Sequence, residues 1–267
     1  MNNKIALIGC GWLGLPLAKS LLKKGYQVAG STTSVEKLSQ LRGNGISPFL
    51  ITLSEEGIDG NIETLLNNAA AVIVNVPPKL RGGSRENYVA KMSFLNAAIL
   101  EAKIPKVIFV SSTSVYGDAS GDVTEETPTL PSTESGKQLL LSENIFREEK
   151  NYETTVIRFG GLIGPNRHPV TMLSKRKNLK NGHHPINLIH LTDCIRVIEE
   201  ILQQGWWNMI FNAVYPYHPS KEDYYTGEAE RRNLQKPDYE PSKKEEGKTI
   251  ISYNLITVKG FEFTTTL

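Results

Sequence analysis

The sequence predicts an α/β fold, a Rossmann-type doubly wound parallel sheet with a small, partly irregular C-terminal substrate domain. Short apolar runs alternate with longer segments of helical period, which is typical of a parallel sheet covered by helices. A glycine-rich turn stands between the first apolar run and the first helical segment, as in dinucleotide-binding folds. After Gly160 the pattern becomes less regular and richer in proline, which indicates a separate small region.

Six short apolar runs are expected to form the strands of the sheet. They are residues 4–8, 27–30, 47–51, 71–76, 106–110 and 154–159. Helices are expected between them at residues 13–24, 35–42, 63–68, 85–102 and 135–150, with one more at 192–203. In the helix at 85–102 the apolar residues recur every three or four positions, which provides a stripe for packing on a sheet.

The chain is expected to divide near residue 160. Residues 1–160 are predicted to form a dinucleotide-binding Rossmann domain, and residues 161–267 a small substrate or cap region. Within that second region, residues 190–204 are expected to pack back on the Rossmann domain.

The composition is that of an ordinary soluble protein. The 267 residues are 39% hydrophobic and carry a formal net charge of +2, which favours neither nucleic acid nor an anionic membrane surface as a partner. No apolar run approaches the roughly 20 residues needed to span a bilayer, so we expect a cytoplasmic protein without a membrane role. The two cysteines, Cys10 and Cys194, predict neither a disulfide framework nor a metal centre.

The turn after the first strand, within "IALIGCGWLGLPLA", places Gly9, Gly11 and Gly14 in the G-x-G-x-x-G spacing. In this motif the first glycine permits a tight turn, the second lets the backbone approach a pyrophosphate, and the third lets helix and strand pack closely. The helix that follows adds unpaired N–H groups and a partial positive charge. We therefore expect these glycines, with Trp12 and Leu13 between them, to bind a dinucleotide cofactor.

The end of the second expected strand bears on which dinucleotide binds. An NAD site usually has Asp or Glu about 20 residues beyond the glycines, to bond the ribose hydroxyls. This chain has Ser31, Thr32 and Thr33 there, with Lys37 close by and no acid before Glu36. Hydroxyl and ammonium groups suit a 2′-phosphate, which a carboxylate would repel. NADP is therefore the preferred cofactor, with NAD as the second choice.

Four stretches occur together in an order that a known family shares. They are the glycine turn, "SSTSVYGD" at 111–118, "VIRFGGLIGP" at 156–165 and "INLIHLTDCI" at 186–195. The chain resembles the extended short-chain dehydrogenase/reductase family, the NAD-dependent epimerase/dehydratase group, over nearly its whole length. The resemblance is nearest to the atypical bacterial branch of YeeZ-like proteins, which have a shortened C-terminal domain.

The resemblance implies a role for each matching residue. The site serine of the family lies four residues before the motif tyrosine, Tyr116, so here it is Ser112. Its hydroxyl would hold the oxygen of a substrate carbonyl or alcohol during hydride transfer, with Thr113 assisting. The loop at 160–165 corresponds to the part near the nicotinamide. Three residues match the segment beside the adenosine half of the cofactor: Asn75, Val76 and Pro77.

The tyrosine of the family's Tyr-x-x-x-Lys motif is missing from this chain. In the family the tyrosinate is the acid/base, and the lysine lowers its pKa and holds the nicotinamide ribose. Lys137 fits the lysine position, but the residue four positions earlier is Thr133. An aliphatic hydroxyl is a far weaker acid than a phenol, whose pKa is about 10. Ordinary tyrosine-dependent chemistry is therefore not expected.

Three explanations for the missing tyrosine are open. Another residue could supply the proton, water held by Ser112 and Thr133 could do so slowly, or the protein binds the dinucleotide without turning over a substrate. The candidates for the first explanation are Tyr116, Glu134, His168, His183 and His184.

Residues in the later motifs are candidates for contacts with the substrate. Arg167 resembles a basic residue that contacts an anionic substrate or the cofactor diphosphate, and Asn187 is expected to point into the substrate pocket, with Tyr116 as a third candidate. His190 and Asp193 match a pair that anchors the following helix, and an acid there also favours the helix dipole. Four residues are assigned to packing or exposed loops instead: Trp206, Trp207, Glu125 and Glu126.

The sequence thus predicts an NAD(P)-dependent oxidoreductase or epimerase/dehydratase-like enzyme that acts on a small polar substrate, for which a sugar derivative is one candidate. The alternative is a catalytically weak or inactive NAD(P)-binding regulatory or sensor protein, because a fold can outlast its activity. We expect a monomer or homodimer without nucleic acid or membrane partners.

Overall fold

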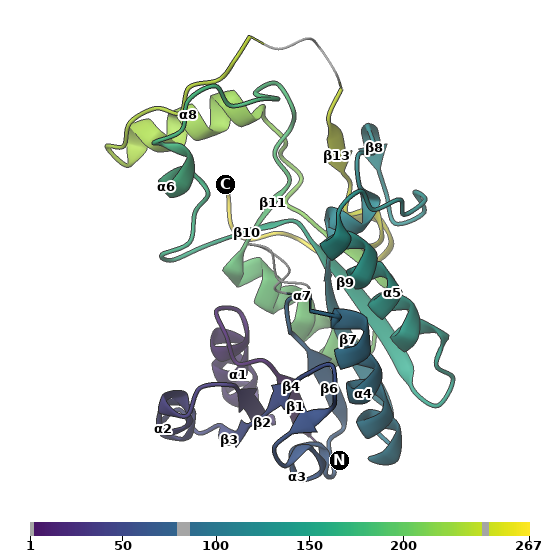
Figure 1. Cartoon of the computed structure of the whole chain (residues 1–267). Helices are drawn as coiled ribbons and strands as arrows, with labels where there is room; N and C mark the ends of the chain where they lie inside the picture. The colour runs from purple at the N-terminus through teal and green to yellow at the C-terminus, as the bar shows by residue number, and fades with distance from the viewer. Residues whose placement is uncertain (1–2, 79–85, 242–245) are drawn as a thin grey trace.

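A parallel sheet forms the core of the protein. The structure, a computed structural model, describes residues 3–78, 86–241 and 246–267, and within them seven parallel strands are arranged in the order β12-β9-β7-β6-β1-β2-β3 (Figure 1). The strands are β1 (Lys4–Ile8), β2 (Gln27–Thr32), β3 (Ser47–Leu50), β6 (Ala71–Val74), β7 (Lys106–Ser112), β9 (Glu153–Phe159) and β12 (Ile210–Ala213). The strand order reverses beside β1, so the switch point of the sheet lies between β1 and β6, where such folds bind ligands.

Helices cover both faces of this sheet (Figure 1). Alternate residues of β1 point to opposite faces of the sheet. Ala6 and Ile8 pack in one buried cluster, while Ile5 and Leu7 pack in another. The first cluster includes residues of α3 (Ile62–Leu66), α4 (Tyr88–Glu101) and α5 (Glu134–Glu148). The second includes residues of α1 (Gly14–Lys23), α2 (Glu36–Gly43) and α7 (Leu191–Gln204).

Short elements at the carboxyl end of the sheet build a smaller region. β10 (Gly161–Ile163) pairs with β11 (Leu188–His190), and β8 (Gly121–Val123) pairs with β13 (Lys248–Ile250). The remaining elements are β4 (Thr52–Leu53), β5 (Ile58–Asp59), the 3-10 turn η1 (Thr113–Tyr116), α6 (Val170–Leu173), α8 (Lys221–Arg231) and the π-helical turn η2 (Asn254–Val258). A third buried cluster joins α6 and α8 to β10 and β11.

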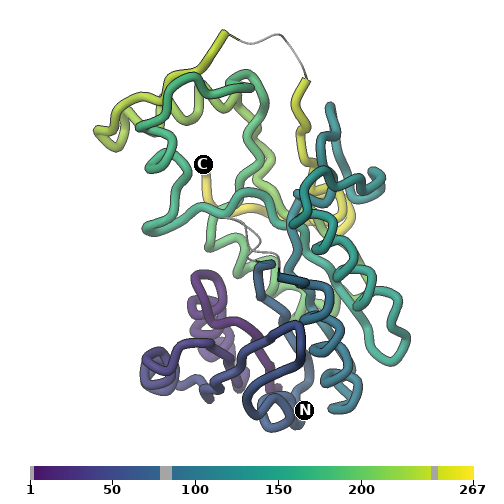
Figure 2. Tube along the Cα trace, in the orientation of Figure 1, coloured from purple at the N-terminus to yellow at the C-terminus, as the bar shows by residue number. Residues whose placement is uncertain are grey.

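The C-terminal segment returns from this smaller region to the sheet. In Figure 2 its yellow trace leaves β13 and runs back to the middle of the molecule. Phe261 packs in the cluster that contains α7, whereas the final residue, Leu267, packs against the cluster of α6 and α8. The last residues of the chain therefore connect the two parts of the fold.

The predicted fold class is confirmed, and each of the six expected strands forms within two residues of its expected ends. The expected helices also form. The one expected at 85–102 begins at Tyr88 with Asn87 as its N-cap, while Arg85 lies outside the described residues. The division at residue 160 stays a prediction.

β12, which pairs with β9 at the edge of the main sheet, was not predicted from the sequence. This strand has only four residues, and the buried Asn212 interrupts its apolar pattern. None of the helices in the described ranges is both long and apolar enough to cross a bilayer.

Candidate functional site

The glycine turn has two positions without room for a side chain and one that is open. Gly9 has a φ of +102°, and a Cβ there would lie 2.4 Å from the carbonyl oxygen of Asn75. A Cβ at Gly14 would lie 2.1 Å from the carbonyl oxygen of Gly9, whereas one at Gly11 would meet nothing within 4 Å. The close positions hold the turn against the sheet, and the open one leaves the space that a pyrophosphate needs.

The start of α1 is available to an anion. Its N-cap residue, Leu13, makes no side-chain capping bond, and the first turn contains no acid. The unpaired N–H groups of a helix N-terminus carry a partial positive charge that favours phosphate. The chain's own residues therefore fit the pyrophosphate of a dinucleotide.

Two expected cofactor residues hold the glycine turn in shape. The Gly9 amide donates a hydrogen bond to Ser31 Oγ at 2.9 Å, and Asn75 Nδ2 donates to the Gly9 carbonyl oxygen at 2.9 Å. Nearby, the Ser34 amide donates to Thr32 Oγ1 at 3.2 Å, so both Ser31 and Thr32 are buried and engaged. Thr33 is exposed, which leaves its hydroxyl as the accessible one at the end of β2.

The loop after β2 also contains an acid that approaches the same place. Ser34 Oγ donates a hydrogen bond to Glu36 Oε2 at 2.5 Å, and this bond lowers the pKa of Glu36. The carboxylate is therefore charged at neutral pH, next to the exposed Lys37. Both charges lie just beyond the end of β2.

The end of β6 is tied to the helix that follows it. The Tyr88 hydroxyl donates a hydrogen bond to the Val76 carbonyl oxygen at 2.7 Å, and Pro77 follows with an exposed side chain. This contact fixes the segment that lies beside the glycine turn at the switch point of the sheet.

The serine segment and the start of α5 lie in contact. Ser112 ends β7, and its Oγ accepts a hydrogen bond from the Ser114 amide at 3.2 Å. A Cβ at Gly136 would lie 3.0 Å from the Ser114 carbonyl oxygen and 3.1 Å from Thr133 Oγ1, so α5 begins directly against η1. Thr113, the other hydroxyl of the pair, is buried.

Thr133 and Lys137 occupy the first turn of α5. The Gly136 amide donates to Thr133 Oγ1 at 3.1 Å, so Thr133 is the N-cap of the helix. The Lys137 amide donates to the Thr133 carbonyl oxygen at 3.0 Å, which places the two residues one turn apart, and both side chains are exposed. The position of the missing tyrosine is therefore taken by a capping hydroxyl.

Tyr116 lies in the core and not at the edge of a substrate site. Its side chain is fully buried, and its hydroxyl accepts from Arg158 Nη1 at 2.9 Å and donates to Asn212 Oδ1 at 2.8 Å. Burial raises the pKa of this phenol, and the Arg158 charge opposes that shift. The expectation that Tyr116 contacts substrate or supplies a proton is corrected, because the hydroxyl has core partners and no exposed surface.

A buried ion pair lies beneath the serine segment. Arg158 Nη2 donates to Glu143 Oε2 at 2.7 Å, and both side chains are almost completely buried. Ser111 Oγ donates to the other oxygen of the same carboxylate. The hydroxyl-rich stretch thus has two sides, since Ser111 faces this pair while Ser112 faces the turn with Ser114.

Arg167 lies over the glycine turn. Its guanidinium carbon is 4.7 Å from the centre of the Trp12 ring, a cation–π contact, and Trp12 Nε1 is 3.5 Å from the Pro165 carbonyl oxygen. A Cβ at Gly164 would lie 3.1 Å from the same ring. The loop at 164–167 therefore packs on the glycine turn, with the exposed Arg167 cation against Trp12.

Asn187 spans the junction between β11 and β13. Its Nδ2 donates to the Lys248 carbonyl oxygen at 2.9 Å, and its Oδ1 accepts from the Ile250 amide at 2.7 Å. The side-chain amide is engaged with backbone at both ends, although the residue lines a cavity of about 570 Å³. Lys221 and Lys248 also line this cavity. Neither was predicted from the sequence, because the C-terminal tail contains many charged residues and none stands out.

The histidines expected as candidate acids lie in the smaller region at the carboxyl end of the sheet. His168 is buried with its Nε2 3.1 Å from the Tyr224 hydroxyl, and burial, with the charges of Arg232 and Arg231, lowers its pKa to about 4. The rings of His183 and His184 contact each other edge to face. Within the described ranges, no group of three or more His, Cys, Asp and Glu residues is placed to hold a metal.

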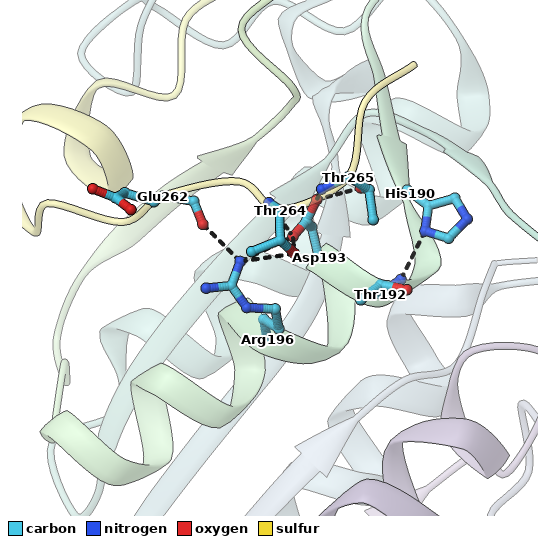
Figure 3. Close-up of polar contacts among 7 residues, drawn as sticks. All are labelled: His190, Thr192, Asp193, Arg196, Glu262, Thr264 and Thr265. Atoms are coloured by element: carbon cyan, nitrogen blue, oxygen red, sulfur yellow. Dashed lines mark hydrogen bonds and ion pairs between the residues drawn. The ribbon is translucent and has the colours of Figure 1, made fainter.

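Asp193 connects α7 to the C-terminal segment (Figure 3). Its fully buried carboxylate accepts hydrogen bonds from the backbone and hydroxyls of Thr264 and Thr265, and from Arg196 Nη1 at 3.1 Å. His190 Nδ1 accepts from the Thr192 amide at 3.2 Å and caps the helix. Both residues anchor α7, as predicted from the sequence.

Comparisons with known proteins find relatives of both the N-terminal part and the whole chain. Residues 4–127 match the model of the NAD binding domain of 6-phosphogluconate dehydrogenase. The chain is 36% identical over 263 residues to protein YeeZ from Escherichia coli (strain K12), which covers 98% of this chain and 96% of that protein. It is 32% identical over 121 residues to UDP-N-acetyl-D-mannosamine dehydrogenase from Methanococcus maripaludis, which covers 42% of this chain and 28% of that protein.

Two solved structures share the fold over nearly the whole chain. A UDP-glucose 4-epimerase from Thermotoga maritima with UDP-glucose has a TM-score of 0.80 at 18% identity and covers 98% of this chain and 94% of that chain. A UDP-glucuronic acid 4-epimerase from Bacillus cereus, in complex with UDP-glucuronic acid and NAD, has a TM-score of 0.80 at 20% identity and covers 98% and 95%. At these identities the likeness shows the fold alone.

Proposed function

We propose that this chain, which belongs to the family of protein YeeZ, is an NAD(P)-dependent oxidoreductase or epimerase/dehydratase-like enzyme of the extended short-chain dehydrogenase/reductase kind. Its substrate would be small, polar and sugar-derived. The observation that supports this most directly is the glycine turn, where Gly9 and Gly14 pack against backbone while Gly11 faces open space.

The residues at the cofactor site each have a task in this proposal. The turn and the start of α1 bind the pyrophosphate, and the cation of Arg167, held on Trp12, neutralises it from the other side. Thr33 and Lys37 bind a 2′-phosphate, so NADP is preferred over NAD. When bound, the nicotinamide accepts or donates a hydride.

The residues at the substrate side hold the reacting oxygen. Ser112 accepts from the Ser114 amide, so its own hydroxyl hydrogen is available to the oxygen of a substrate carbonyl or alcohol. Lys137 holds the nicotinamide ribose from α5. Because Thr133 replaces the phenol, a water held between the hydroxyls of Ser112 and Thr133 moves the proton, and turnover is slow.

A cofactor titration of wild type and a Gly11→Ala variant tests the proposal. The added Cβ would meet nothing within 4 Å in the protein, so the variant folds normally but fills the space for the pyrophosphate. We expect the affinity for NADPH and NADH to fall at least tenfold, measured by quenching of protein fluorescence. Gly227→Ala is the matched control, because its Cβ is also in open space, on α8. Wild-type affinity in the Gly11→Ala variant would contradict cofactor binding at this turn.

A second candidate function is an NAD(P)-binding sensor without catalysis, favoured by Thr133 serving as the N-cap of α5. The two candidates differ in turnover, since both bind the cofactor. Oxidation of NADPH with a panel of sugar-derived carbonyl compounds, lost in the Ser112→Ala variant, would support the enzyme. Tight cofactor binding with no turnover of any compound would support the sensor.

A further inference from the structure

A cavity of about 570 Å³ lies where distant parts of the chain meet. Its walls come from the loop after η1, the start of β11, the first residue of α8 and the start of β13. The sheet side and the cap side of the molecule therefore both contribute to it, as expected of a substrate site in a two-part enzyme.

One wall of the cavity is directly connected to the loop assigned to the nicotinamide. The Gly161 amide donates to the Asn187 carbonyl oxygen at 2.8 Å, and a Cβ at Gly160 would lie 2.6 Å from that oxygen. Asn187 thus contacts the loop on one side and the cavity on the other. Gly117 also lines the cavity, and it follows Ser112 by five residues along the chain.

Two lysines line this cavity. Lys248 Nζ donates to the Gly117 carbonyl oxygen at 2.5 Å, and Lys221 is the first residue of α8. Both side chains are half-buried, and within the part of the chain that the structure describes neither ammonium is within ion-pair distance of a carboxylate. Two acids on the lining, Asp118 and Glu246, are exposed.

The electrostatics of the cavity favour an anion. Burial lowers the pKa of Lys221, and burial together with the Lys221 charge lowers the pKa of Lys248, while Asp118 opposes this. Two partly desolvated ammonium groups repel each other. An anion between them stabilises both charges, because it accepts charge-assisted hydrogen bonds from each.

We propose that Lys221 and Lys248 bind an anionic oxygen group of the substrate, a phosphate or a carboxylate, in the cavity between Gly117 and Asn187. This inference rests on the proposed function and specifies its substrate class as an acid. The anion held by the two lysines would direct the rest of the substrate along the Gly117 and Asn187 walls toward Ser112. A neutral sugar would lack this contact.

Calorimetric titration of the apoprotein with three compounds tests the proposal: glucose 1-phosphate, glucuronate and glucose. We expect saturable binding of at least one of the two anions and none of glucose, and the better anion identifies the group as phosphate or carboxylate. In Lys221→Gln and Lys248→Gln the affinity should fall about tenfold or more, because each removes a charge-assisted bond. The Lys221→Arg variant should retain most of the affinity.

Lys175→Gln is the matched control, since Lys175 is an exposed lysine in the same part of the chain and does not line the cavity. Labelling with an amine-reactive ester gives a second measurement, in which the bound anion should protect Lys221 and leave Lys175 unaffected. Absence of saturable anion binding by wild type, or equal affinity in wild type and the Lys221 and Lys248 glutamine variants, would overturn the proposal. If the anion test fails while the Lys221 and Lys248 variants keep normal NADPH affinity, only the anion site is wrong. Failure of the proposed function would instead appear in the Gly11→Ala titration.

Discussion

The cofactor side and the substrate side of the molecule differ in how their residues act. At the glycine turn, backbone geometry decides each position, since a Cβ at Gly9 or Gly14 would collide with backbone and one at Gly11 would not. Beneath the serine segment of the substrate side, long-range side-chain contacts decide, since Tyr116 bonds to Arg158 and Asn212 inside the core and Arg158 pairs with Glu143. A site built from backbone can be recognised from a short motif, whereas one built from side-chain partners requires the fold.

The largest expected effect tests the substrate side. Glu143→Gln leaves the Arg158 charge buried without its partner, which should lower the free energy of unfolding by about 3–5 kcal/mol. Chemical denaturation measures this loss. The control is Glu230→Gln, which removes the exposed pair with Lys236 and should cost less than about 1 kcal/mol. Equal losses in the two variants would show that the buried pair does not support the serine segment.

The next effect tests the cofactor side. Gly14→Ala places a Cβ 2.1 Å from the Gly9 carbonyl oxygen, so backbone must move, and we expect a loss of about 1–3 kcal/mol in unfolding free energy. Cofactor affinity should fall with it, measured in the same preparation. Gly11→Ala should lose affinity without losing stability. If both variants were equally stable, close packing would not distinguish the third glycine from the second.

A smaller effect concerns pH dependence on the substrate side. The pKa of His168 is lowered to about 4 by burial and by Arg232 and Arg231, so folding favours the neutral ring. Its contribution to stability is full above the unfolded pKa of about 6.5 and is lost as the pH falls toward 4.

The difference in unfolding free energy between wild type and His168→Gln, measured from pH 7 to pH 4, should therefore shrink by about 1–2 kcal/mol. Tyr224→Phe, which keeps the histidine but removes its hydroxyl partner, should preserve most of the slope. A difference that is constant with pH would contradict a buried neutral His168.

The smallest effect refines the cofactor side. Glu36→Gln removes a negative charge near the position proposed for the 2′-phosphate and should raise the affinity for NADPH about two- to fivefold, with little change for NADH. Parallel titrations at low and high salt measure it, because an exposed charge is screened by salt. Glu63→Gln, on α3, is a control outside this loop. An equal gain for both cofactors would place the 2′-phosphate elsewhere.

Most of the sheet and the glycine turn could be predicted from the sequence. Alternating apolar runs and helical stripes depend on neighbours within a few residues, and the six expected strands and their helices form. β12 could not be predicted in this way, because Asn212 is a polar residue whose partner, Tyr116, is 96 residues away. The seventh strand is stabilised by a contact that no local pattern shows.

The sequence by itself determined the fold class, the glycine turn and the absence of a tyrosine at Thr133, because these depend on residue type and short spacing. Only the tertiary structure decided what the remaining polar residues do. It placed Tyr116 in the core, Asn187 against the backbone of β13, and Lys221 and Lys248 around one cavity. The physical reason is that hydrogen bonds and charge interactions depend on distance in space, which chain folding sets between residues far apart in sequence.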